Sequence, residues 1–164
     1  ELCCAASDAC RELGYEPVIL TDCLDCEARK AGKMLAEKAL ENINPPRPLA
    51  LIAGGETVVH ITGKGKGGRN QEIALSAARY ISGRMNVAVF SAGSDGTDGP
   101  TDAAGGFADG HTAEKLKALG IDIDEVLADN DSYNALSACG GLIITGATGT
   151  NVNDVSVALI KKEE

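Results

Sequence analysis

Short apolar runs alternate with stretches of helical periodicity along most of this chain of 164 residues. The apolar runs are too short for helices and lack polar alternation, which is typical of strands buried on both faces of a sheet. This alternation predicts an α/β fold: a single domain with a mixed sheet flanked by helices on both faces. We expect strands at 17–20, 49–53, 86–91, 142–145 and 155–160, and helices at 2–13, 26–43, 70–82, 112–119 and 132–139.

Three local patterns refine this expectation. The β-branched run 57–61 follows a glycine turn and is expected to pair with 49–53 as a hairpin. The glycine- and aspartate-rich stretch 93–110 predicts a long loop. Asp22 or Asp25 is expected to cap the helix that follows.

Prolines at 45, 46 and 48 mark the best candidate for an internal boundary. Residues 1–48 are therefore predicted to be a connecting helix-strand-helix segment, packed on the same domain as residues 49–164. The chain begins inside a predicted helix, so we expect a piece of a longer protein.

The formal net charge of −9 argues against nucleic acid as a partner. No apolar run is long enough to suggest a membrane span. The six cysteines, without a secretory signal, indicate reduced thiols and a cytoplasmic location. Cys23 and Cys26 form a CxxC pair that lacks a second pair for a zinc site, so they are expected to be packing residues.

A glycine-rich basic loop at 62–69 is the most informative motif for function. Glycines admit close approach of the backbone, cations supply charge, and the following helix offers unpaired N–H groups. The cationic side chains and free amides of residues 63–70 are therefore expected to form a pocket for an anionic, phosphorylated ligand. The loop does not match a Walker A motif, and it is too basic for a dinucleotide fingerprint. Its candidate binding residues are Lys64, Lys66, Gly67, Gly68, Arg69 and Asn70.

Arg69 stands next to the predicted helix start, where its fork of donors can bridge anion oxygens. Asn70 is expected to be the N-cap of that helix, and Glu72 to orient Arg69 or Asn70.

An acidic loop at 91–102 follows the predicted strand 86–91. Carboxylates at a strand end can hold Mg²⁺, accept a hydroxyl proton or bond substrate hydroxyls. Asp95, Thr97 and Asp98 are therefore candidate binding residues, with Asp95 and Asp98 as candidate metal ligands. The alternative is that these aspartates only cap turns.

Three weaker signals complete the candidate site. Asn151 and Asn153, in a Gly/Thr/Asn loop, suit polar ligand contacts. Glu56 follows two glycines at a strand end and is either a ligand contact or a solvated turn residue. Asp131 is expected to cap the helix at 132–139.

Taken together and in order, these motifs resemble the carboxy-terminal region of the bacterial-type glycerate 2-kinases, often called the MOFRL domain. The resemblance rests on Gly54–Thr57, Gly63–Glu72, Ser91–Gly105, Ala128–Tyr133 and Thr145–Asp154, and it runs from about residue 49 to 160.

The resemblance implies ATP-dependent phosphorylation of D-glycerate to 2-phosphoglycerate with Mg²⁺. The active site would lie in the cleft with an N-terminal Rossmann-like domain that this chain lacks, so the chain alone is expected to be inactive. The resemblance also implies that Arg69 is catalytic or contacts phosphate, with Glu56, Lys64, Asn70, Asp95 and Asp98 lining the cleft. Arg69 or Lys66 would alternatively clamp the glycerate carboxylate.

Two other functions remain open. Some members of this family carry the name hydroxypyruvate reductase, but an oxidoreductase needs a nicotinamide site, and the sequence shows no GxGxxG with a downstream acidic residue for the ribose. A non-catalytic anion-binding module would bind phosphate ligands without turnover.

Overall fold

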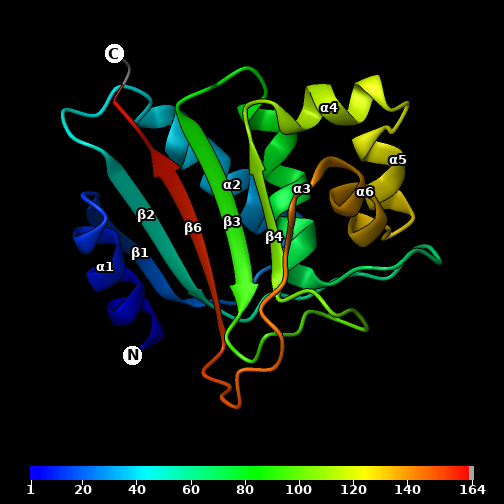
Figure 1. The fold of residues 1–164 in the computed structure, drawn as a ribbon, viewed down its shortest axis with the longest axis horizontal. Helices are drawn as coiled ribbons and strands as arrows, with labels where there is room; N and C mark the ends of the chain where they lie inside the picture. The colour runs from blue at the N-terminus through cyan, green and yellow to red at the C-terminus, as the bar shows by residue number, and fades with distance from the viewer. Residues whose placement is uncertain (163–164) are drawn as a thin grey trace.

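The structure, a computed structural model, describes residues 1–162 and consists of one six-stranded sheet with helices on both faces (Figure 1). The strand order is β1-β2-β6-β3-β4-β5. Only β1 and β2 run parallel, and every other neighbouring pair is antiparallel, so the sheet is mixed as predicted. The strands are β1 (Glu16–Leu24), β2 (Leu49–Gly55), β3 (Val87–Gly93), β4 (Gly105–Asp109), β5 (Leu142–Ile143) and β6 (Asp154–Ile160).

The helices divide unequally between the two faces (Figure 1). One helix covers one face over β1, β2 and β6, while two long helices cover the other. Three short helices pack on the outer side of α3, around Leu75, Leu116 and Leu136. The helices are α1 (Leu2–Glu12), α2 (Ala28–Glu41), α3 (Arg69–Ile81), α4 (Thr112–Ala118), α5 (Ile123–Ala128) and α6 (Ser132–Cys139).

Strand β2 shows why the central strands are apolar on both sides. Leu51 and Ala53 are buried against α2 and α3, whereas Ala50 and Ile52 are buried against α1. A strand covered on both faces needs no polar alternation. The core thus forms on either side of the sheet, and the loops at its ends remain available for function.

The predicted hairpin between 49–53 and 57–61 is wrong. Both edges of β2 are taken, one by β1 and the other by β6, so no edge is left for residues 57–61. That segment makes only an isolated parallel bridge, from Val58 to Glu27. It leaves the sheet and forms one wall of the cavity described below.

Strand β4 lies inside the stretch predicted to be a loop. Gly105 and Gly106 suggested a turn, but they serve close packing within the sheet. A Cβ at Gly105 would lie 1.9 Å from the carbonyl oxygen of Ser91, and one at Gly106 would lie 2.5 Å from Leu136. Glycine in a strand can mark such close approach rather than a turn.

Two further local predictions need correction. The N-cap of α2 is Glu27, not Asp22 or Asp25, and its side chain makes no capping hydrogen bond. The predicted strand 142–145 is reduced to the two residues of β5.

Residues 1–48 contribute α1, β1 and α2 to the same sheet and core as the rest. The division at residue 48 stays a prediction, and residues 163–164 of its second segment lie outside the described residues. Within residues 1–162, no helix combines the length and the apolar character that a bilayer crossing requires.

Candidate functional site

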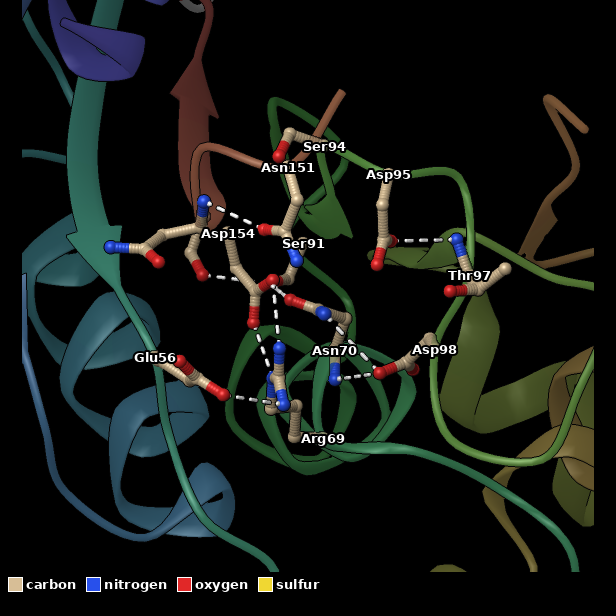
Figure 2. A network of polar contacts seen from close by, with 12 residues as sticks. Glu56, Arg69, Asn70, Ser91, Ser94, Asp95, Thr97, Asp98, Asn151 and Asp154 are labelled. Atoms are coloured by element: carbon tan, nitrogen blue, oxygen red, sulfur yellow. Dashed lines mark hydrogen bonds and ion pairs between the residues drawn. The ribbon is translucent and has the colours of Figure 1, made fainter. Parts of the chain in front are cut away.

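Arg69, the first residue of α3, lies at the centre of the candidate site (Figure 2). Its Nε donates to Oδ2 of Asp154 at 2.5 Å, and its Nη2 donates to Oδ1 at 3.2 Å. Its Nη1 lies 3.1 Å from Oε1 of Glu56. The hydrogen bond to Asp154 raises the pKa of the guanidinium above its ordinary value, although partial burial opposes the rise. Arg69 is therefore a permanent cation held between two carboxylates.

The pairing of β6 with its two neighbouring strands determines the position of Asp154. Asp154 begins β6 and lies opposite Gly55 at the end of β2 and Gly93 at the end of β3. A Cβ at Gly93 would lie 3.3 Å from Oδ1 of Asp154, so the glycine leaves room for the carboxylate. The Asp154 side chain is only 8% exposed. The central strand thus presents a buried acid to the helix N-terminus beside it.

A cavity of about 600 Å³ opens beside Arg69. Part of its wall is apolar and comes from Val58, Val59, Ile61 and Pro100. Among the residues predicted for the site, four line this cavity: Glu56, Gly67, Gly68 and Arg69.

The glycine-rich loop packs along the segment 129–131. Four successive amides, those of residues 63–66, donate at 2.7–2.9 Å to Asp129, Asn130 and Asp131. The expectation that these amides are free for an anion is therefore wrong. Within the described part of the chain, Gly67, Gly68 and Arg69 are the loop residues whose amides have no such acceptor.

The same packing explains the spacing of the glycines. A Cβ at Gly63 would lie 2.3 Å from Cα of Asp129, and one at Gly65 would lie 2.4 Å from Cβ of Asp131. At Gly67 the corresponding distance is 2.1 Å to Oγ of Ser132. Every second residue must be glycine because the two segments are in backbone contact.

The two lysines of the loop are not part of the cavity wall. Both are exposed. Nζ of Lys66 lies 4.1 Å from the centroid of the Tyr133 ring, a cation–π arrangement. The Tyr133 hydroxyl donates to Asp102 at 2.7 Å. Arg69 is thus the one cation of the loop that faces the cavity.

Asp98 caps α3 from a distant loop. Its Oδ1 accepts the amide of Asn70 at 3.0 Å and its Oδ2 accepts the amide of Gln71 at 2.9 Å. Asp98 is 2% exposed, and this burial raises its pKa while the helix amides oppose the rise. The N-cap position itself is Gly68, so the expectation that Asn70 caps the helix is wrong.

Asn70 is instead a buried link between α3 and the sheet. Its Nδ2 donates to Oδ1 of Asp98 at 3.2 Å, and its Oδ1 accepts from Oγ of Ser91 at 2.6 Å. Ser91 in turn contacts Oγ of Ser156 on β6 at 2.7 Å. This chain of hydrogen bonds fixes the start of α3 on the two central strands (Figure 2).

Glu72 was expected to orient Arg69 or Asn70, but it contacts other residues. Its carboxylate pairs with Arg29 of α2, with both oxygens at 3.4 Å, and its Oε1 accepts from Nδ2 of Asn130 at 2.9 Å. Glu72 is 1% exposed. It therefore holds α2 and the 129–131 segment together at the cavity wall, which Glu72 and Asn130 both line.

The remaining predicted residues form a second polar cluster at the end of β3, next to Asp154 (Figure 2). Asp95 accepts the amide of Thr97 at 3.0 Å, which lowers the pKa of its carboxyl. The carbonyl of Asn153 accepts the amide of Ser94 at 3.1 Å, and Oδ1 of Asn151 accepts the amide of Asn153 at 3.3 Å. The two loops are thus joined beside Asp154.

Comparison with known proteins identifies the family. The MOFRL family matches residues 49–154. The chain belongs to the MOFRL family. It is 55% identical over 164 residues to a D-glycerate 2-kinase of Thermotoga maritima, covering 98% of this chain and 39% of that protein.

Two further relatives agree with this assignment. A crystal structure of glycerate kinase from Thermotoga maritima superposes with a TM-score of 0.93 at 55% identity, covering 97% of this chain and 39% of that one. A protein of Agrobacterium vitis named as a hydroxypyruvate reductase is 38% identical, covering 95% of this chain and 37% of that protein. The chain thus spans about two fifths of the length of these relatives.

The predicted metal site finds little support in this MOFRL chain. Residues 1–162 contain no group of three or more His, Cys, Asp or Glu side chains placed to hold a metal ion. Both oxygens of Asp98 already accept helix amides and the residue is 2% exposed, so a magnesium ion at this carboxylate would have to compete with those hydrogen bonds. Asp95 and Asp98 as metal ligands stay a prediction.

Two residues important to the site were missed from the sequence. Asp154 ends the Gly/Thr/Asn loop. The feature that could have indicated its role is its position as a charged residue directly before the apolar strand 155–160. Asn130 has a left-handed backbone with φ of 58°. Its side chain accepts the amides of Thr62 and Gly63, but nothing near residue 130 in sequence indicated that contact.

Proposed function

We propose that this chain is the carboxy-terminal part of a glycerate 2-kinase, which transfers a phosphoryl group from ATP to D-glycerate and gives 2-phosphoglycerate. The observation that carries the proposal is the position of Arg69. Its guanidinium lines a cavity of about 600 Å³ and is fixed by two hydrogen bonds to the carboxylate of Asp154. The relatives' names supply the substrate.

Phosphoryl transfer depends on positioning and on neutralising charge at the transferred group. In the proposed reaction the C2 hydroxyl oxygen of glycerate attacks the terminal phosphorus of ATP. The bond from this phosphorus to the bridging oxygen of ADP breaks, ADP leaves, and the hydroxyl proton is released. Arg69 would donate N–H groups either to the phosphoryl oxygens or to the glycerate carboxylate, because both are oxyanions that a guanidinium binds well. A donor held in advance in this way costs no reorganisation during the reaction.

The site needs a second domain to complete it. Arg69 is the one loop cation that faces the cavity, and its charge is already balanced by Asp154 and Glu56. A triphosphate requires more positive charge than this. We propose that the N-terminal Rossmann-like domain implied by the family resemblance supplies it, and that this chain alone is inactive.

Mg²⁺ and a cytoplasmic location belong to the same proposal. The ion would accompany the nucleotide, since both oxygens of Asp98 already accept helix amides. The six cysteines all carry free thiols, which supports a reducing compartment.

The decisive experiment is a coupled ATP/glycerate assay of the full-length protein beside this chain. Arg69→Ala should lower kcat by at least ~100-fold, the scale of a lost transition-state donor. Arg79→Ala is the matched control, since Arg79 pairs with Asp124 on the surface away from the cavity. A near-normal kcat for Arg69→Ala removes Arg69 from catalysis.

The alternative functions predict other results for the full-length protein. Phosphate binding without turnover would favour an anion-binding module, and NADH binding would favour the oxidoreductase.

A further inference from the structure

The guanidinium of Arg69 has N–H donors that make no hydrogen bond within the described residues. An arginine carries five N–H donors. Asp154 accepts one from Nε and one from Nη2. The others, on Nη1 and Nη2, have no hydrogen-bond acceptor among residues 1–162, because the contact of Nη1 with Glu56 at 3.1 Å is an ion pair without hydrogen-bond alignment. The outer edge of the guanidinium is therefore incompletely satisfied.

The two carboxylates that contact Arg69 differ in how firmly they are held. The Asp154 side chain is 8% exposed and is fixed at the start of a central strand. The Glu56 side chain is 59% exposed and follows the last residue of β2. Exposed ion pairs contribute little free energy, since water and salt compete for both charges. Glu56 can therefore leave Arg69 at low cost, whereas Asp154 cannot.

We infer that Glu56 occupies the position that a substrate oxyanion takes on the outer edge of Arg69, and that binding of this substrate displaces the Glu56 carboxylate. The inference rests on the proposed function, which supplies two candidate oxyanions: the carboxylate of glycerate and a phosphate of the nucleotide. Either would accept the unused N–H donors in a fork-like arrangement. Because Glu56 competes for the same edge, it lowers the apparent affinity for that substrate.

Glu56→Gln in the full-length enzyme tests this directly. Removing the competing charge should lower the KM of the displacing substrate by about two- to five-fold, the range that an exposed ion pair allows. The comparison is made on KM, since Glu56 competes with the incoming substrate for the outer edge of Arg69. A lower KM for glycerate alone assigns the position to its carboxylate, and a lower KM for ATP alone assigns it to a phosphate.

Glu41→Gln is the matched control. The Glu41 side chain is also 59% exposed and pairs with Lys38 at 2.8 Å, but it lies at the end of α2 and does not line the cavity. It should change neither KM. If Glu56→Gln behaves like Glu41→Gln, or raises either KM, the inference is overturned.

A binding measurement separates this inference from the proposed function. Inorganic phosphate and D-glycerate are titrated into the full-length protein by calorimetry, with wild type beside Glu56→Gln. Tighter binding of either ligand by the variant supports the inference even if no turnover with ATP and glycerate is found. Equal or weaker binding of both overturns it even in an active kinase. The thermal midpoint of the variant should match that of wild type, since Glu56 is exposed.

Discussion

Arg69 and Asp154 meet side-on although 85 residues separate them in the sequence, so the pair exists only once β6 has joined the sheet beside α3. The acid takes the inner edge of the guanidinium and leaves the outer edge toward the cavity. A cation fixed in this way can be aimed at a substrate before the substrate arrives.

Asp154→Asn should lower kcat of the full-length enzyme by about 10- to 100-fold, because a small displacement of a positioning contact is enough to reduce turnover on this scale. The asparagine keeps the shape of the side chain but offers one acceptor instead of two. The KM values should change less than kcat. Steady-state kinetics measure both.

Asp124→Asn is the control for this variant, since Asp124 also pairs with an arginine but lies on the surface. A further test uses Arg69→Ala with added guanidinium ion. Guanidinium should restore part of the activity when Asp154 is present and none when it is replaced. Equal rescue in both backgrounds would show that Asp154 does not position the cation.

Asp98→Ala should reduce the free energy of unfolding by about 1–3 kcal/mol, the cost of leaving buried donors without an acceptor. The amides of Asn70 and Gln71 both lose their partner at the start of α3. Denaturant titration followed by circular dichroism measures the change.

Asp95→Ala serves as the comparison, because Asp95 accepts one amide in a neighbouring loop outside the helix. The same pair of variants tests the metal prediction. If Mg²⁺ raises the thermal midpoint of wild type and Asp98→Ala abolishes that shift with little loss of stability, Asp98 is a ligand rather than a cap.

Sequence patterns were sufficient to predict those helices and strands whose residues show a clear local periodicity or a short apolar run. The helix beginning at Arg69 and the buried strand around Ile52 follow from periodicity and from short apolar runs, and the structure has both. The family resemblance, rather than a local pattern, implied that Arg69 and Glu56 belong to one site, and in the structure both line the same cavity.

The roles of several site residues depend on contacts with residues far away in the sequence, which a local pattern does not reveal. Asp98 was interpreted as a metal ligand because its partner amides lie 27 and 28 residues away. The glycines of the basic loop suggested an anion, but their neighbours are Asp129 and Asp131, more than 60 residues further on. A glycine spacing shows that something approaches the backbone closely, but the sequence does not say whether that is a ligand or another segment of the chain.

Gly65→Ala should destabilise the loop and impair turnover, because the new methyl group would lie 2.4 Å from Cβ of Asp131 and 2.7 Å from the carbonyl oxygen of Asp129. Overpacking of this kind typically costs about 1–3 kcal/mol. Hydrogen exchange provides the measurement: the amides of residues 63–66 should be protected in wild type and exchange faster in the variant.

Lys64→Ala is the matched control for stability, since its side chain is exposed and only its backbone contacts Asp129. It should leave exchange at residues 63–66 unchanged. Rapid exchange of these amides in wild type would mean that the loop is not held by the 129–131 segment, and would reopen the expectation of free amides.

The cysteines should react in an order set by burial. Cys4 and Cys23 are exposed, whereas Cys3 and Cys10 are 6% and 8% exposed, and burial raises the pKa of both buried thiols. Because the thiolate is the reactive species, a raised pKa leaves less of it at any given pH and slows alkylation. Iodoacetamide at neutral pH should therefore label Cys4 and Cys23 first, as peptide mass mapping can follow. In denaturant the four rates should converge. Early labelling of Cys3 and Cys10 in the native protein would show that α1 opens from the sheet far more readily than its packing against Ile52 and Val157 implies.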